Sequence, residues 1–511
     1  MNNPETYHNQ LSRRRAIGLL GLGMGAIQFP MGCTKDKSMK DSVKSESIHY
    51  MTLSKISKMI RKKEISSAEL TQIILNRITT VDKKLNSYLT TFNEAALATA
   101  SKLDEELESG KYRGPLHGVP IAVKDLLYTT NAPTTGGHAF KTDFVPSYNA
   151  TVVNKLDEAG AVILGKTNLT EGAMAGYHPH FKIPVNPWGP YHPGESSSGS
   201  GVATAAGLCF GAIGTDTGGS IREPALMNGL VGLKPTYGLV SRYGVIPLAE
   251  SMDHVGPITR SIEDASIMLQ AIVGYDPNDP TSLQTEIPDI TGSLKKGING
   301  VRIGVDPHYL HDGVEPWLSL AIQSAIKKIT DIGARIIPVK IPGKKEEWDA
   351  AWYAITAKEA IVAHKETYPS RRDEYGIFFR DFLDYGKSVS EEKYSTAMQY
   401  REDLSNKIRN LFSEVDIIAT PTGGMPKAYS EEVIRGPMAG WDPYLADFDW
   451  HFTALANLVG IPALSLPCEV AKEGPPPGIQ FMGDNFSEPL LCRVGYALEQ
   501  VTPWHERHPD I

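Results

Sequence analysis

The stretch PGESSSGSGVATAAGLCFGAIGTDTGGSIREPA, residues 193–225, is the most informative part of this sequence. Two turns rich in glycine and serine, at residues 196–198 and 218–220, enclose a run of mostly apolar residues. Because that run is long enough for one buried helix and a short strand, the stretch is not typical of a flexible glycine–serine linker. Glycine lets the backbone approach a ligand closely, and serine supplies a hydroxyl that can act as a nucleophile or proton relay. The pattern predicts a site to which two hydroxyls are delivered.

This stretch resembles the signature sequence of the amidase signature family of serine hydrolases. Four further segments are similar to segments of that family and come in the family's order: GPLHGVPIAVKD at 114–125, GAVILGKTN at 160–168, VGLKPTYGLVSRYGVIPLAESMDHVGPITRSIEDA at 231–265 and GIQFMGDNFSEPLLCRVGYALE at 478–499. The resemblance runs from roughly residue 50 to the end of the chain. It implies an α/β protein with the amidase signature fold, in which helices cover both faces of a large twisted mixed β-sheet.

The resemblance also implies three catalytic roles. Ser220 matches the nucleophile, Ser196 matches the bridging serine that sits on a cis peptide bond, and Lys124 matches the general base. The two serines are 24 residues apart, as in the family pattern. No metal and no cofactor takes part in this chemistry, and the expected partner is a small-molecule amide.

The turn around Ser220 is expected to stabilise the negative oxygen of the reacting amide. Backbone N–H groups of four consecutive residues can converge on one oxygen as an oxyanion hole: Thr217, Gly218, Gly219 and Ser220. Three neighbouring residues are expected to support the loop rather than to react: Asp216 and Arg222 as a structural pair, and Ser197 beside the bridging serine.

The chemistry requires an uncharged lysine at neutral pH. An ordinary lysine has a pKa near ~10.4, and burial can lower this pKa by roughly 3–5 units. Lys124 follows the apolar run 119–123, which is typical of a buried strand. A neutral Lys124 could take a proton from Ser196 while Ser196 takes one from Ser220. The reverse transfer would then protonate the departing amine, and water would hydrolyse the acyl-enzyme.

Two residues depart from the family pattern Gly-Gly-Ser-Ser-Gly-Gly. Glu195 stands at the second glycine and Ser198 at the third. A residue with a Cβ is restricted where glycine is free, which affects the backbone expected for this loop. A carboxylate near Lys124 would also favour the protonated amine. We therefore expect Glu195 either to point away from the proton relay or to shift activity to higher pH.

Other motifs indicate no competing chemistry. Residues 160–167 match the nucleotide-binding pattern GxxxxGK[ST], but the residues between its glycines are apolar and predict a strand, which excludes a phosphate-binding loop. Residues 293–296 match SxxK, yet they lie in a polar turn without the partner motifs of penicillin-binding enzymes. Three histidines, His178, His180 and His192, lie among prolines and are interpreted as exposed loop residues rather than metal ligands.

Composition is that of an ordinary globular protein of 511 residues, with 41% hydrophobic and 22% charged residues. The net charge of −8 gives no basic footprint for nucleic acid. Residues 50–511 are predicted to form a single amidase domain, with a helical excursion at about 344–411 whose aromatic residues are candidates for a wall of the substrate pocket. A monomer and a homodimer both remain open.

The N-terminus predicts export. Arg13 and Arg14 precede the apolar, glycine-rich residues 16–29, a layout similar to a twin-arginine signal peptide. Cys33 follows Met31 and Gly32 and resembles a bacterial lipoprotein cleavage point, so it is the candidate lipidation site and the one route to membrane attachment. We expect an export signal at 1–32, a polar tether at 33–49, and a location in the periplasm or on a membrane outside the cytoplasm.

These observations favour an exported amidase that hydrolyses a carboxamide C–N bond to a carboxylate and ammonia or an amine, through a Ser-cisSer-Lys triad and an acyl-enzyme. Two alternatives are kept. One is the glutaminase component of an amidotransferase, which releases ammonia from glutamine, because residues 231–265 resemble that component closely. The other is an inactive binding protein of the same fold. The substrate is not readable from the sequence.

Overall fold

The computed structural model describes residues 48–311, 314–423, 430–438, 451–471 and 473–511. The predicted export signal, Cys33 and nearly all of the predicted tether lie outside these residues. Residues 45–511 form one compact unit. No helix in the described ranges is both long enough and apolar enough to cross a membrane.

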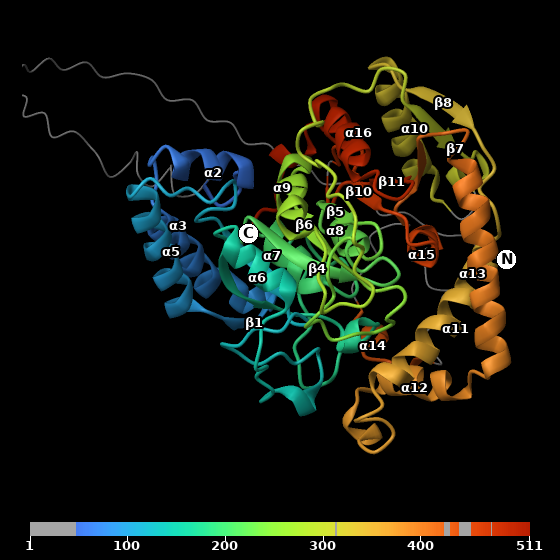
Figure 1. The fold of residues 1–511 in the computed structure, drawn as a ribbon, viewed down its shortest axis with the longest axis horizontal. Coiled ribbons are helices and arrows are strands. Elements are labelled where there is room, and N and C mark those ends of the chain that lie inside the picture. The colour runs from blue at the N-terminus through green and yellow to red at the C-terminus, as the bar shows by residue number, and fades with distance from the viewer. Residues whose placement is uncertain (1–47, 312–313, 424–429, 439–450, 472) are drawn as a thin grey trace, which may run out of the picture. The chain divides into compact units, whose positions relative to one another are not determined.

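A mixed β-sheet organises this unit (Figure 1). The order of its eleven strands, among the described residues, is β1-β3-β2-β4-β6-β5-β10-β11-β9-β7-β8. The strands are β1 Tyr88–Thr91, β2 Pro120–Lys124, β3 Val162–Thr167, β4 Gly211–Asp216, β5 Val231–Lys234, β6 His254–Thr259, β7 Arg302–Val305, β8 Arg335–Pro338, β9 Ile417–Pro421, β10 Ala463–Pro467 and β11 Gly478–Gly483.

The sheet combines parallel and antiparallel pairs. Strands β3, β2 and β4 run parallel to one another, as do β9, β7 and β8, and antiparallel pairs join the strands between these two groups. Strands β2, β4, β6, β5, β10, β11 and β9 are buried along their whole length, so they read as continuous apolar or small residues rather than as alternating ones. The mixed α/β architecture expected from the resemblance is confirmed.

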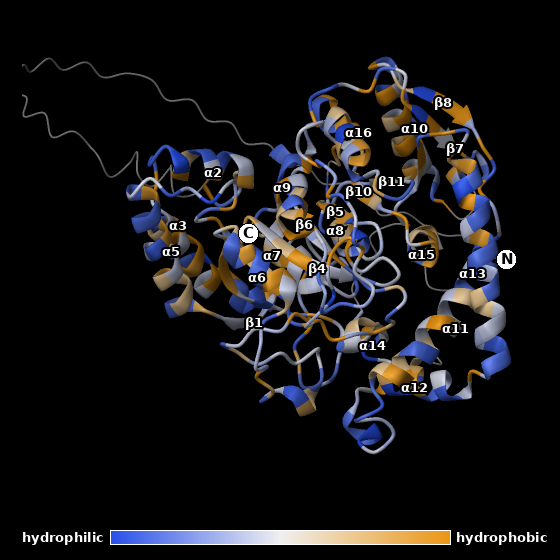
Figure 2. Cartoon of the chain, in the orientation of Figure 1, coloured by the Kyte–Doolittle hydropathy of each residue, from blue (hydrophilic) through white to orange (hydrophobic). Residues whose placement is uncertain are grey.

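Helices cover both faces of the sheet. The helices α7 (Ser198–Ala205) and α8 (Arg222–Met227) pack on each other and on β4 and β5, and α9 (Ile262–Ile272) and α16 (Glu488–Val501) pack on each other and on β6 and β10. In Figure 2 the central strands are mostly coloured as apolar, as expected for strands enclosed between helical layers. The remaining helices of four residues or more are α2 Leu53–Arg61, α3 Ser67–Arg77, α5 Asn93–Glu108, α6 Thr151–Glu158, α10 Pro316–Asp331, α11 Lys345–Ala363, α12 Ile377–Ser388, α13 Glu391–Leu411, α14 Glu431–Ile434 and α15 His451–Leu458.

Local sequence explains several helix boundaries. The periodic stretch 54–77 is divided into α2 and α3, because Ser66 accepts a hydrogen bond from the N–H of Glu69 and so caps the second helix. Helix α7 begins at Ser198, four residues before the apolar run that predicts it, because the glycine–serine turn itself forms the first helical turn. The turn and the helix therefore make one structural unit.

The excursion at 344–411 contains α11, α12 and α13, which pack on one another beside the sheet, at the right of Figure 1. Helix α13 carries mostly polar residues outward (Figure 2), while α11 and α12 bury large aromatic side chains. The buried aromatic residues are Trp348, Trp352, Phe378, Phe379 and Phe382.

Candidate active site

Lys124 is the last residue of β2 and is completely buried. Its Nζ lies 2.6 Å from Oγ of Ser196 and 2.9 Å from Oγ1 of Thr215, which stands on the neighbouring parallel strand β4. Both partners are hydroxyls rather than carboxylates. The end of the buried strand therefore holds a lysine amine in contact with two neutral groups.

This environment lowers the pKa of Lys124 well below its ordinary value. The main cause is burial, which penalises the ammonium form, while the charges of Asp216 and Asp253 act in the opposite direction. The amine is thus shifted toward the neutral form that a general base requires.

The serine turn brings Ser196 to Lys124. The peptide bond between Glu195 and Ser196 is cis, and Ser196 is completely buried. Ser197 exchanges two hydrogen bonds with the backbone of Thr215, each of 3.2 Å, and so ties the turn to β4. Ser197 therefore has the supporting position that was expected for it.

A buried ion pair fixes the loop after β4. The Arg222 guanidinium donates to both carboxylate oxygens of Asp216 at 3.0 Å, and neither side chain is exposed. Arg222 also donates to Gln480 and to Asn457, each at 2.6 Å. Burial alone would raise the pKa of Asp216, but the Arg222 charge and its hydrogen bonds hold that pKa well below the ordinary value.

Asp216 also uses backbone groups of the loop. Its carboxylate accepts the N–H of Gly219 at 2.8 Å and the N–H of Ile221 at 3.2 Å. Of the four N–H groups expected in the oxyanion hole, those of Thr217, Gly218 and Ser220 have no acceptor in the described part of the chain. The Gly219 N–H serves to shape the loop.

Both glycines of this turn are required by close packing. A Cβ on Gly218 would lie 2.7 Å from the ring of Trp352, and one on Gly219 would lie 2.5 Å from Oγ1 of Thr453. Trp352 donates to the carbonyl of Thr217 at 2.8 Å, and Thr453 donates to the carbonyl of Gly218 at 2.6 Å. The loop carbonyls are thus turned toward α11 and α15.

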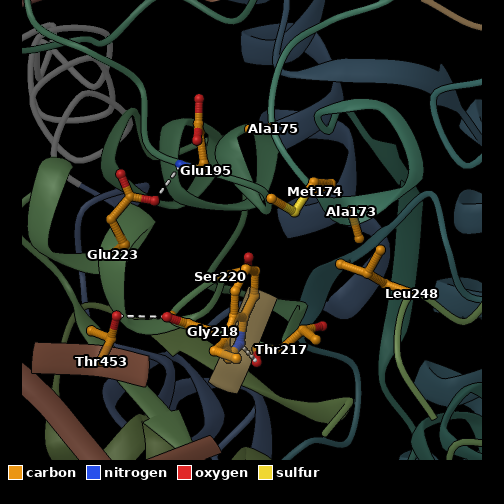
Figure 3. A pocket seen from close by; sticks show the side chains of 12 residues that line it. Ala173, Met174, Ala175, Glu195, Thr217, Gly218, Ser220, Glu223, Leu248 and Thr453 are labelled. Atoms are coloured by element: carbon orange, nitrogen blue, oxygen red, sulfur yellow. Dashed lines mark hydrogen bonds between the residues drawn. The ribbon is translucent and has the colours of Figure 1, made fainter. Parts of the chain in front are cut away.

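Ser220 faces a cavity. Figure 3 shows its hydroxyl directed into the space between Glu195 and Glu223 on one side and Met174 and Leu248 on the other. Within the described residues no hydrogen bond joins the hydroxyls of Ser220 and Ser196, so one half of the expected relay, Lys124 to Ser196, is formed. The residues that line the cavity are Ala173, Met174, Ala175, Glu195, Thr217, Gly218, Gly219, Ser220, Glu223, Leu248, Trp352 and Thr453.

The two departures from the family pattern cause no backbone strain. Neither Glu195 nor Ser198 is among the residues with positive φ, whereas Gly194 before them has φ +92°. The Glu195 carboxylate lies 3.6 Å from Nε2 of His192 and points away from Ser220 (Figure 3). The carboxylates that act on the pKa of Lys124 are Asp216 and Asp253, as described above.

The other motifs lie away from the cavity. Residues 162–167 of the nucleotide-like pattern form strand β3, and Lys166 is buried there in an ion pair with Asp125 at 2.9 Å. This geometry cannot cradle a phosphate. Among the three loop histidines His180 is exposed and the other two are half-buried, and no group of three metal-ligating side chains occurs in the described ranges.

Several residues of the site carry no signal in the sequence. Thr215 reaches Lys124 only because β2 and β4 are adjacent, and Asp253 accepts the hydroxyl of Thr217 at 2.6 Å from the start of β6. Asn457 and Gln480 reach the Asp216–Arg222 pair from far along the chain. The aromatic excursion did indicate Trp352 as a candidate pocket wall, and Trp352 does line the cavity.

Comparison with known proteins places this chain in a family. Residues 69–492 match the family model described as Amidase, so the chain belongs to the amidase family. It is 43% identical to the Mycobacterium tuberculosis protein named "Putative amidase AmiD" over 93% of this chain and 99% of that protein. It is 36% identical to the A-type component of the glutamyl-tRNA(Gln) amidotransferase of Desulfatibacillum aliphaticivorans, over 91% of this chain and all of that component.

A solved structure has the same fold. The peptide amidase of Stenotrophomonas maltophilia is 32% identical and superimposes with a TM-score of 0.78, covering 90% of this chain and 98% of the peptide amidase. The expected family and fold are therefore confirmed.

Proposed function

We propose that this protein is an amidase that cleaves the C–N bond of a carboxamide through an acyl-enzyme on Ser220. The observation that carries the proposal is the buried amine of Lys124, 2.6 Å from the Ser196 hydroxyl and without a carboxylate partner among the described residues. An amine held in this way has a lowered pKa and can accept a proton near neutral pH. Relatives that are named as amidases support the same reaction.

The residues divide the reaction between them. Neutral Lys124 takes the Ser196 proton, Ser196 takes the Ser220 proton, and Ser220 Oγ attacks the amide carbonyl as its C=O electron pair moves to oxygen. The negative oxygen is received by the N–H groups of Thr217, Gly218 and Ser220.

Collapse of the intermediate returns the electron pair to the carbonyl and breaks the C–N bond, while Ser196 gives its proton to the leaving nitrogen and regains one from Lys124. Water then attacks the acyl-enzyme with Lys124 and Ser196 acting as base again, and it releases the carboxylate and Ser220. Burial of the relay prevents the amine from being protonated by solvent.

A panel of primary, aryl and peptide amides tests this proposal. The parent is expected to release ammonia or amine from at least one class, and Ser220→Ala is expected to lose at least about 10³-fold in kcat/KM. Ser293→Ala, which removes the serine of the SxxK-like turn outside the cavity, is the matched control and should match the parent. An enzyme that hydrolyses no amide and leaves Ser220 unlabelled by a fluorophosphonate would instead be the inactive binding protein.

The second candidate is the glutaminase component of an amidotransferase, favoured by the 36% identity to the A-type component of a glutamyl-tRNA(Gln) amidotransferase. Such a component alone is expected to show weak glutaminase activity that rises with its partner proteins. Co-purification of the native protein with such partners, and stimulation of glutamine hydrolysis by them, would replace the amidase proposal. The predicted export argues against a reaction that needs charged tRNA.

We also propose that the protein is exported and attached outside the cytoplasm through Cys33. The paired Arg13 and Arg14 before the apolar segment support this proposal. Cell fractionation tests it. Changing both arginines to lysine should retain the protein in the cytoplasm, and Cys33→Ser should release it from the membrane fraction without blocking export.

A further inference from the structure

We propose that Glu195 selects amide substrates that carry a protonated amine. This inference rests on the proposed amidase function and names the class of its substrate. Among the described residues that line the cavity, the charged side chains are Glu195 and Glu223, and both are carboxylates. The cavity therefore presents negative charge to a bound amide.

The cavity has two unlike walls. Figure 3 shows Glu195 and Glu223 on one side of Ser220, and Met174, Ala173 and Leu248 on the other. An apolar wall lowers the local dielectric, which strengthens attraction between a carboxylate and an ammonium group. The arrangement suits an amide with an apolar portion and, on the opposite side, a cationic amine.

The position of Glu195 is fixed by its neighbours. Its backbone N–H donates to the Glu223 carboxylate at 2.5 Å, and the N–H of Glu223 donates to the carbonyl of Gly219 at 2.7 Å. These contacts join the turn before Ser196 to the turn before Ser220. The side chain of Glu195 therefore starts from a defined point at the cavity and lies close to both reacting serines in the chain.

The nearby histidine does not neutralise Glu195. Nδ1 of His192 accepts the N–H of Gly194 at 3.1 Å, so that nitrogen carries no proton and the ring is neutral, with its proton on Nε2. Nε2 then faces the Glu195 carboxylate at 3.6 Å as a neutral donor. The charge of the carboxylate is left for a ligand, and a substrate ammonium is the matching group.

Pairs of amides that differ only in charge test the inference. The acyl-side pair is L-leucinamide and 4-methylpentanamide, and the leaving-side pair is N-(2-aminoethyl)butanamide and N-propylbutanamide. In the parent, kcat/KM for the cationic member of at least one pair should exceed that for the neutral member by at least about tenfold, the factor expected for a hydrogen bond to a charged group. In Glu195→Gln this ratio should fall to near one.

Glu158→Gln is the matched control, because it removes the same charge from an exposed residue of α6 outside the cavity, and it should keep the parent ratio. Two results overturn the inference while leaving the amidase function intact: hydrolysis of the neutral members with no preference for charge, or a preference that survives in Glu195→Gln. Failure to hydrolyse any amide overturns the amidase function and the inference together. The pair that responds identifies whether the amine belongs to the acyl portion or to the leaving group.

Discussion

Two buried lysines at the ends of neighbouring strands have different partners. Among the described residues, Lys124 at the end of β2 donates to the hydroxyls of Ser196 and Thr215, whereas Lys166 on β3 pairs with Asp125 at 2.9 Å and donates to Thr134 at 2.7 Å. Burial lowers the pKa of both amines, but the adjacent carboxylate opposes this effect at Lys166. The same side chain in the same sheet is thus directed to proton transfer in one place and to structure in the other.

The comparison predicts the largest effect for loss of Lys124. Lys124→Met should lower kcat/KM by about 10³-fold or more, because no other group described at the relay can accept the Ser196 proton. Its free energy of unfolding should change less than that of Lys166→Met, since Lys124 balances no buried charge by direct contact. Steady-state kinetics and urea unfolding measure the two quantities. A Lys124→Met enzyme with near-parent activity would contradict the assigned role.

Lys166→Met should have the opposite signature. It leaves Asp125 buried without its ammonium partner, which is expected to cost about 3–5 kcal/mol of the free energy of unfolding. The double variant with Asp125→Asn should be less destabilised than the sum of the single variants, by about 1–3 kcal/mol. Urea unfolding of the four proteins measures this coupling, and strict additivity would show that the pair does not act as a unit.

Thr215→Val tests the second hydroxyl on Lys124. Loss of this hydrogen bond should lower kcat/KM by about tenfold, the usual worth of one such contact. The Thr215 oxygen also stabilises the ammonium form, so its removal should move the acid limb of the pH–rate profile to lower pH. Thr215→Ser keeps a hydroxyl at the same strand position and should restore both properties. Equal profiles for the valine and serine variants would contradict the contact.

Glu195→Gly should have the smallest effect on the proton relay. The structure assigns the opposing charges at Lys124 to Asp216 and Asp253, so removal of Glu195 should move the pH midpoint by less than that of Asp253→Asn, which should shift it to lower pH. Both profiles are measured on one neutral amide. A larger shift for Glu195→Gly than for Asp253→Asn would show that Glu195 acts on the amine after all.

The contrast also explains what the sequence could predict. Motif spacing was enough to predict the three candidate catalytic residues and the Asp216–Arg222 pair, because each lies within a short, distinctive segment. The partners of Lys124 and Lys166 depend on which strands are adjacent. Strand order joins β2 to both β3 and β4, and no local pattern encodes that order. Long-range contacts such as Arg222 with Gln480 were therefore beyond sequence reasoning.

The pH dependence of Ser220 labelling by a fluorophosphonate tests the central claim, that Lys124 is a neutral base, without knowledge of the substrate. Lys124 works only when deprotonated, so the rate should be lost as pH falls through its lowered pKa and should reach a plateau well below pH ~10.4, the ordinary lysine value. Lys124→Met should label at least about 10³-fold more slowly. A rate that keeps rising to that pH, or parent-like labelling in Lys124→Met, would contradict the account.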